Sequence, residues 1–580
     1  MKLFSELKRR NVHRMAVLYA VTSWLIMQAA EVVMTLAALP EWTGQLTLIL
    51  LALGFPIALI FSWFYELTPE GISLEKDIKA GESITHVTGR RLDFIVIAML
   101  CAAVIMFAYD KWWISGSPVT SIAVLPLDDF SADAEQQYLA DSMTEVLTAE
   151  LGQIESLQVT SRTSAMQYKD TNKLLPQIAD ELRVDAIVEG SIQPAGDKVR
   201  FTLQLIDGRT DRHLWARSYH RDLRDILTLQ GEIARAIAGE IQVTLTPQTE
   251  ARLARDRTVD SEALRLWAVG NHHLMGLNDD SFSKALQAFI EASNRDPEFA
   301  PAYAGIARAY YFLGSWFGSH KLKSILPLAR MAAEKAVRLD PDLAEARFAL
   351  AVIYQYEWQW DAADQEFLNG AALNASDAIG LMEYANFLTA MGRADEAIEI
   401  ARRAVQLDPV LPSAYNELGW ALSASGPNAN ALEQYQKALQ LDSDYFQTHW
   451  ALTYHHINAG EFDEALPHLQ KLGENLELTV PTQVGYVGRF YARIGRHGDA
   501  RDILELLRKR METEYVPAMA LALVHLGLED YEEAIPLLEA AYEERDPSLI
   551  WLRYIYALPD TFRNDPRFQG IMNRMNFPET

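Results

Sequence analysis

A His-Arg-Asp tripeptide at residues 220–222 is the clearest catalytic candidate in the sequence. In protein kinases this tripeptide belongs to the catalytic loop, where the Asp accepts the proton of the substrate and an Asn five residues later binds a metal ion. Here Leu227 stands at the position of that Asn, and neither a glycine-rich loop nor a strand lysine precedes the tripeptide. We interpret the match as a coincidence and predict no catalytic residues.

Histidine and cysteine do not form a metal-binding pattern either. His272 and His273, like His455 and His456, are adjacent on predicted helices, where neighbouring side chains point about 100° apart and do not converge on one ion. The single cysteine, Cys101, excludes an intrachain disulfide and a cysteine-based zinc site. The sequence also lacks the motifs GxxxxGK[ST], GxGxxG, GxSxG and HExxH. We therefore predict a protein that is not an enzyme and holds no metal or cofactor.

The distribution of charge argues against nucleic acid as a partner. The net charge is −26, and the first 114 residues are neutral, so the remainder of the chain is strongly acidic. Binding to phosphate groups needs a basic surface, which this composition does not supply. The sequence predicts a protein or peptide partner instead, and it is compatible with a homo-oligomer.

A period of 34 residues organises the chain from Ala344 to about Glu477. When repeats are counted from Ala344, Ala378, Pro412 and Phe446, the eighth and twentieth residues of each repeat are small. These residues are Ala351, Ala385, Gly419 and Thr453 at position eight, and Ala363, Ala397, Ala431 and Ala465 at position twenty. The pattern resembles the tetratricopeptide repeat (TPR), in which small residues let two antiparallel helices approach closely.

Less regular copies extend the same register in both directions. The resemblance implies an all-α TPR solenoid of about eight repeats over residues 261–546, in which each helix pair buries its apolar face against the next pair. Residues 547–580 are expected to form a C-terminal helical cap over the last apolar face.

The first helix of each repeat predicts a groove for a partner. Several positions on this helix are turned towards the concave side of the solenoid, and aromatic and amide side chains recur there. They are Phe348, Gln355, Tyr356, Asn386, Asn416, Trp420, Trp450, Tyr454 and Asn458. Rings supply contact area and amides can hydrogen-bond the backbone of an extended peptide. The alternative is that these rings only pack between repeats.

Residues 119–246 predict a small α/β domain. Val199, Phe201, Leu203 and Leu205 alternate with polar residues after the turn sequence PAGD, which is typical of a β-hairpin. The strings SIAVLPLDDF, YLADSMTEVLTAEL, VTSRTSA, VDAIVEGSI and HLWARSYHRDLRDILTLQGEIARAI together resemble the TolB N-terminal and FlgO-like domains. Such domains precede TPR arrays in bacterial proteins that often begin with a class III adenylate cyclase. The resemblance implies an accessory or interaction domain without a catalytic signature.

Residues 1–114 predict a membrane anchor of three transmembrane helices, at about 15–39, 43–65 and 92–112, because each run is apolar and near the length that crosses hydrocarbon. Basic residues precede the first run and lie between the second and third. The positive-inside rule then places the N-terminus in the cytoplasm and the soluble body in the periplasm, outside a bacterial inner membrane.

Together these observations predict a multi-domain protein with a three-helix transmembrane anchor, a small α/β domain and an all-α TPR solenoid. The expected function is an inner-membrane-anchored scaffold or adaptor that binds a protein or peptide through the TPR groove, with the lipid bilayer as a second partner. The alternative is a non-catalytic sensor whose α/β domain binds a ligand and signals through the membrane spans.

Overall fold

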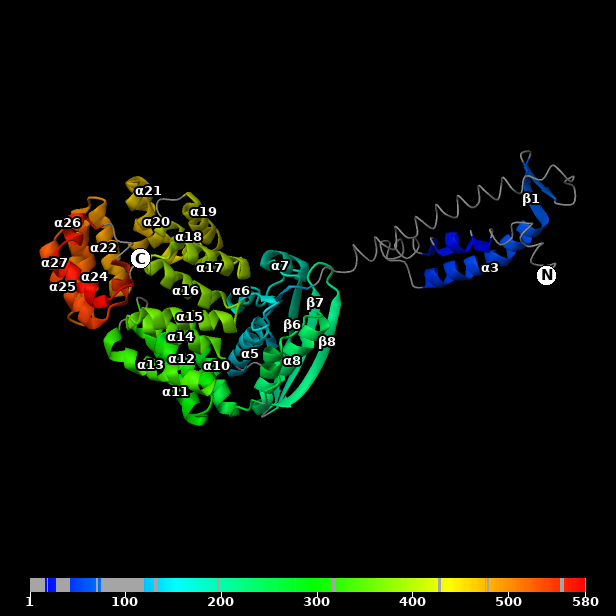
Figure 1. The fold of residues 1–580 in the computed structure, drawn as a ribbon, viewed down its shortest axis with the longest axis horizontal. Helices are drawn as coiled ribbons and strands as arrows, with labels where there is room; N and C mark the ends of the chain where they lie inside the picture. Colours follow the sequence, from blue (N-terminus) through cyan, green and yellow to red (C-terminus); the bar gives the residue numbers. More distant parts are fainter. Residues whose placement is uncertain are drawn as a thin grey trace. The chain divides into compact units, whose positions relative to one another are not determined.

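The computed structural model of the chain divides into two compact units, Met1–Pro118 and Val119–Thr580. Figure 1 shows the ribbon coloured along the sequence. The structure describes residues 16–27 except 18 and 25, residues 42–74 except 69–70, and residues 119–578 except 130–133, 196–197, 256, 277, 316–319, 426–428, 475, 477–478 and 553–557.

The described part of the first unit contains one long helix and a hairpin. Helix α3 (Trp42–Phe64) contains Pro56 and leads directly into strand β1 (Tyr65–Thr68). Strand β1 pairs antiparallel with β2 (Gly71–Leu74), which places Leu67 opposite Ile72. The hydroxyl of Tyr19 donates a hydrogen bond to the carbonyl of Leu51 at 2.8 Å, so the short helical stretch before residue 27 contacts α3.

The expected three-helix transmembrane anchor is corrected by the structure. Among the residues described, none of the helices combines the length and the apolar character needed to cross a bilayer. Within the first expected span the structure describes only residues up to 27, and the third expected span lies outside the described residues. Helix α3, which covers the second expected span, is continuous and contains Pro56. The inner-membrane location with a periplasmic body, which was derived from these spans, and the bilayer as a partner are corrected with them.

A mixed sheet forms the centre of the α/β module, residues 119–246. Its strands are β3 (Ser121–Val124), β4 (Asp128–Asp129), β5 (Gln158–Val159), β6 (Ala186–Ala195), β7 (Lys198–Asp207) and β8 (His213–Asp222). The order is β5-β3-β6-β7-β8, with β3 parallel to both neighbours and β6, β7 and β8 antiparallel. The predicted hairpin is confirmed, since β6 pairs with β7 along its whole length. The likeness to TolB N-terminal domains stays a prediction.

Helices cover both faces of this sheet and connect it to the rest of the second unit. Apolar residues of α5 (Ala134–Gly152) and α8 (Ile226–Glu240) pack on one face, and α7 (Leu175–Leu182) packs on the other. The short helix α6 (Arg162–Met166) contacts both β3 and α5. The first of these hydrophobic cores continues through α5 into the helices that follow the module. The α/β module and the helical array therefore share buried apolar surface rather than being joined only by a linker.

Paired helices make up the remainder of the second unit, which is an all-α TPR solenoid. The pairs are α10 (Ser261–Leu274) with α11 (Asp279–Arg295), α12 (Ala300–Gly314) with α13 (Leu322–Leu339), α14 (Ala344–Tyr356) with α15 (Trp360–Leu373), α16 (Ala378–Ala390) with α17 (Ala394–Leu407), α18 (Pro412–Ala424) with α19 (Ala429–Leu441), α20 (Phe446–Ala459) with α21 (Phe462–Leu472), α22 (Pro481–Arg493) with α23 (His497–Arg510), and α24 (Ala518–Gly527) with α25 (Tyr531–Glu544). Helices α14, α16, α18 and α20 begin at the residues from which the period was counted.

Small residues set the spacing inside each pair. The alanines at position twenty are fully buried, and Gly419 at position eight lies so close to the ring of Tyr435 that an added Cβ would come within 2.5 Å of it. Because Tyr435 has no exposed surface, its ring fills the space that Gly419 leaves. Small residues on one helix therefore leave space for an aromatic side chain on the other helix of the pair.

The C-terminal elements return to the middle of the array. Helix α25 lies beside the α14–α15 turn, where Tyr542 packs on Trp358 with ring centroids 4.7 Å apart and the Arg545 guanidinium lies 3.8 Å from the Trp358 ring centroid. After η4 (Pro547–Leu552) and α26 (Asp560–Arg563), α27 (Pro566–Met575) ends where the Met575 carbonyl accepts a hydrogen bond from Trp360 Nε1 at 3.0 Å. Figure 1 shows the array curving so that its red end approaches the green helices. These contacts thus join α25 and α27 to the α14–α15 pair, so the array closes between its third and eighth helix pairs.

We expect Gly419→Ala to lower the free energy of unfolding by about 1–3 kcal/mol, because the new methyl group overlaps the immobile ring of Tyr435. The matched control is Gly570→Ala in α27, where nothing lies within 4 Å of the added Cβ. This change should stabilise the protein by up to about 1 kcal/mol, since alanine favours a helix. Urea unfolding followed by circular dichroism measures both, and equal effects would contradict the packing argument.

Candidate functional site

A cavity of about 300 Å³ lies among the first helices of the central repeats; we call it the groove cavity. Side chains from α12, α14, α16, α18, α20 and α22 line it, together with Trp551 of η4. Consecutive repeats present the same face of their first helix, because the 34-residue period repeats the orientation of each position. The cavity is therefore built by many repeats, none of which forms it alone.

Most of the residues predicted for the partner groove line this cavity. They are Gln355, Tyr356, Asn386, Asn416, Trp420 and Trp450. Three others lie elsewhere. Phe348 is buried against Phe367 and lines a second cavity, Tyr454 stacks on Trp450 with ring centroids 5.6 Å apart, and Asn458 is exposed near the end of α20. Binding of a partner by these residues stays a prediction.

The tryptophans of the groove cavity pack on one another. Trp420 and Trp450 are each 7% exposed, with ring centroids 5.0 Å apart. Trp551 meets Trp420 edge-on at 6.0 Å, and Tyr486 meets Trp450 edge-on at 5.3 Å. Most of the surface of these rings is therefore used in packing between repeats, which is the alternative that the sequence left open. The remaining surface forms the wall of the cavity.

Two half-buried carboxylates, which the sequence analysis missed, face the groove cavity. Burial raises the pKa of Glu417 to about 8 and that of Glu383 to about 7. Asn386 Nδ2 donates to both Glu417 oxygens at 3.4 Å, and the Tyr311 hydroxyl donates to Glu383 at 2.8 Å. Glu383 and Glu417 are 34 residues apart, at position six of successive repeats, so the period itself could have identified them.

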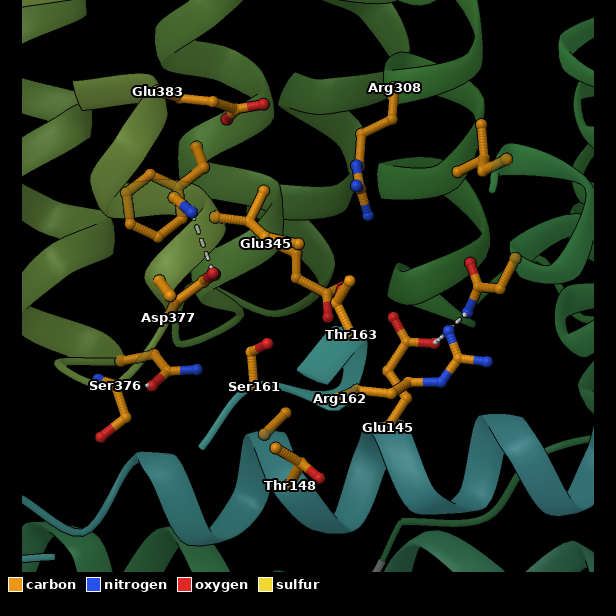
Figure 2. Close-up of a pocket in the computed structure, with 18 of the residues that line it drawn as sticks. Glu145, Thr148, Ser161, Arg162, Thr163, Arg308, Glu345, Ser376, Asp377 and Glu383 are labelled. Carbon is orange, nitrogen blue, oxygen red and sulfur yellow. Dashed lines mark hydrogen bonds and ion pairs between the residues drawn. The ribbon is translucent and has the colours of Figure 1, made fainter. Parts of the chain in front are cut away.

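A second, smaller cavity of about 130 Å³ lies where the α/β module meets the solenoid; we call it the junction cavity. Figure 2 shows its polar lining, with Ser161, Arg162 and Thr163 from the module and Arg308, Glu345, Asp377 and Glu383 from the array. Tyr311 and Glu383 line both cavities, so one pair of side chains separates them.

Burial dominates the electrostatics of the junction cavity. It raises the pKa of Glu345 to about 7, with a further contribution from Glu145, although Arg308 opposes the rise. The pKa of Asp377 is raised for the same reason. Desolvation alone would lower the pKa of Arg308, but Tyr311 and the surrounding carboxyl groups raise it, so this guanidinium stays charged. The cavity therefore holds a cation among acids whose charged forms are disfavoured.

The module is held on the solenoid by polar contacts beside the junction cavity. The hydroxyls of Ser161 and Ser164 both donate to the carboxylate of Asp408, which is fully buried. Burial raises the pKa of Asp408 to about 6. Ser376 Oγ donates to the carbonyl of Leu157 at 3.3 Å. These bonds fix the end of α6 against the array.

Within the described part of the chain, no group of three or more His, Cys, Asp or Glu side chains could hold a metal ion. The His-Arg-Asp tripeptide lies on β8 and continues into η3 (Leu223–Asp225). Arg221 pairs with Glu232 at 3.0 Å, which is a surface ion pair.

We expect Glu417→Gln to change how stability depends on pH. A carboxyl whose folded pKa is about 8, against an ordinary value of 4.5, stabilises the folded state at low pH, and this stabilisation is lost as pH rises from about 4.5 to about 8. Glutamine does not ionise, so the variant does not lose this stabilisation. Between pH 5 and pH 8.5 its free energy of unfolding should therefore rise by about 1–3 kcal/mol relative to that of the natural protein. Urea unfolding at both pH values measures this. Glu399→Gln, at an exposed position of α17, is the control and should show no such trend. Parallel pH profiles for Glu417→Gln and the natural protein would contradict the burial of Glu417.

Comparison with known proteins gives matches over parts of the chain. Residues 362–445 match the family model described as the bacterial transcriptional activator domain. A Rhizobium meliloti protein named Putative adenylate cyclase 3 is 32% identical over 246 residues, which are 42% of this chain and 42% of that protein. Type IV pilus assembly protein PilF of Pseudomonas aeruginosa is 32% identical over 116 residues, 20% of this chain and 46% of PilF. The chain thus spans less than half the length of these curated relatives.

Solved structures give local superpositions. The Pseudomonas aeruginosa PilF structure has a TM-score of 0.29 and 22% identity, and covers 38% of this chain and 95% of that chain. YrrB, described as a TPR protein with an unusual peptide-binding site, has a TM-score of 0.23 and 20% identity, covering 32% and 89%. A human IFIT1 dimer with m7Gppp-AAAA has a TM-score of 0.37 and 17% identity, covering 55% and 76%. With the 34-residue period and the paired helices, the sequence matches identify the chain as a TPR-containing protein.

Proposed function

We propose that this TPR protein is a scaffold without catalytic activity that binds an extended segment of a partner protein in the groove cavity. The observation that carries the proposal is the convergence of Gln355, Asn386, Asn416 and Trp420 on one cavity from three consecutive repeats. Side chains contributed by successive repeats, such as Asn386 and Trp420 at position nine, suit a chain that runs along the array, because an extended peptide also presents its groups at regular intervals.

The amides give the groove its capacity for hydrogen bonds to a peptide backbone. Asn416 accepts from Thr448 Oγ1 at 3.0 Å through its side-chain oxygen, which leaves its NH₂ group to donate. Asn386 uses its NH₂ group towards Glu417, which leaves its oxygen as an acceptor. Neighbouring repeats therefore offer one donor and one acceptor, the pair that a peptide unit requires.

The charge of the groove cavity specifies the partner further. Glu383 and Glu417 line it, whereas none of its described lining residues is a lysine or an arginine. A buried carboxylate without a cation is costly, and a cationic side chain from the partner would supply the missing charge. Aromatic rings beside the carboxylates favour the same occupant through cation–π attraction. We propose that the bound segment carries a lysine or arginine side chain that enters this cavity.

The test uses the full chain and a set of fluorescein-labelled peptides with identical Gly, Ala, Leu and Tyr flanks around a single central Lys, Arg, Gln or Glu. Fluorescence anisotropy should show binding of the Lys and Arg peptides, about tenfold weaker binding of the Gln peptide, and the weakest binding of the Glu peptide. Binding that does not depend on the central residue would contradict the cationic side chain, and no binding of any peptide would contradict the groove.

Variants locate the interaction within the chain. Glu417→Gln keeps the shape of the side chain and removes the negative charge that Glu417 would acquire beside a bound cation, so the Lys peptide should bind about tenfold more weakly. Glu399→Gln changes an equal charge on the exposed side of α17 and should leave the affinity unchanged. Equal losses in the two variants would show that the overall acidity of the protein, rather than the groove cavity, attracts the peptide.

A further inference from the structure

The junction cavity contains charged groups that interact electrostatically with one another but make no direct hydrogen bond or ion pair with the described part of the surrounding protein. Across the described residues, the guanidinium of Arg308 and the carboxylate of Glu345 make neither a hydrogen bond nor an ion pair, although both line the cavity. Figure 2 shows the side chains of Arg308, Glu345 and Glu383 extending into the same space from the solenoid, with Ser161 and Arg162 on the opposite side. A guanidinium carries five N–H donors, and in this partly buried cavity those of Arg308 remain available to a ligand.

The other charges of the cavity are already engaged. Arg162 lies 3.8 Å from Glu145, and Glu145 also accepts a hydrogen bond from Asn271 at 3.3 Å. Asp377 caps α16 by accepting from the backbone N–H of Gly380 at 2.9 Å. Arg308 therefore remains as the cation available to an incoming group. Glu345, and Glu383 with its one hydrogen bond from Tyr311, remain as acids that a bound cation would ionise.

We propose that the junction cavity binds a small zwitterionic molecule of the α-amino acid type, with its carboxylate at Arg308 and its ammonium group at Glu345 and Glu383. A ligand that carries both charges satisfies the guanidinium and the carboxylates at once, whereas a simple amine or a simple carboxylate satisfies only one side. A cavity of about 130 Å³ has room for a molecule of several non-hydrogen atoms.

The position of the cavity gives such a ligand contacts on both sides of a boundary within the second unit. Thr163 of α6 and its N-cap Ser161 come from the α/β module. Arg308, Glu345 and Glu383 come from α12, α14 and α16. The ligand would therefore sit between the module and the array rather than inside the module. Because Glu383 also lines the groove cavity, the ammonium group would lie beside the wall of the proposed peptide site.

The experiment measures the melting temperature of the full chain with each of the standard L-α-amino acids added singly, followed by titration calorimetry with those that raise it. Ethylamine and propionate, the amine and carboxylate halves of alanine, are tested in parallel. At least one amino acid should raise the melting temperature and bind at least about tenfold more tightly than either half. The absence of any rise, or equal binding of a half, would overturn the proposal.

Two variants test the assignment to this cavity. Glu345→Gln and Thr163→Val change lining residues on opposite sides of the cavity. We expect Glu345→Gln to weaken binding of the selected amino acid by about tenfold or more, and Thr163→Val to weaken it by about tenfold or less. Glu399→Gln should bind as the natural protein does. Unchanged affinity in folded Glu345→Gln would place the amino acid elsewhere and overturn the proposal. No peptide is used, so failure here leaves the groove assignment intact, and failure of the peptide test leaves this one intact.

Discussion

The close approach of paired helices through small residues is the constraint on which this structure depends. At Gly419 and at the alanines of position twenty, a larger side chain would push the two helices of a pair apart, because the facing position holds a fully buried residue such as Tyr435. The same spacing repeated every 34 residues aligns the first helices of successive repeats. The groove cavity follows from that alignment, since residues from different repeats meet only if each pair has the same geometry.

Burial of charge is the second theme of the structure. A soluble surface usually leaves its acids in water, yet Glu345, Glu383 and Glu417 line cavities in which burial raises their pKa values into the neutral range. These groups lower the stability of the folded chain at neutral pH, and sites for binding are where such a cost is commonly found. Glu383 and Glu417 lie at position six and Glu345 at position two of the first helices of their repeats, so these helices give the array an acidic interior.

The sequence predicted the parts of this fold that depend on local pattern. The 34-residue spacing predicted paired helices that begin at Ala344 and Ala378, and the alternation through Val199 predicted the hairpin of β6 and β7. Apolar composition alone was a poor guide in the first unit, because it carries no information on where a helix such as α3 ends and the β1–β2 hairpin begins. Trp551 could not be placed in the groove cavity from the sequence, since it arrives from η4 through the curvature of the whole array. The pKa values of the buried acids depend on the same long-range packing.

Contacts of Tyr542 and Arg545 with Trp358, and of Met575 with Trp360, join the last repeat and α27 to the third repeat, so the interior between the third and the eighth repeats is bounded. A ring of repeats that is closed in this way would not admit from the side a peptide strand that has a folded domain at each end. Such a strand could enter only after the Trp358 and Trp360 contacts had opened, whereas a free chain terminus could enter end first. The stability of these aromatic contacts would then determine the residence time of a bound peptide more than the affinity of any single side chain inside the array.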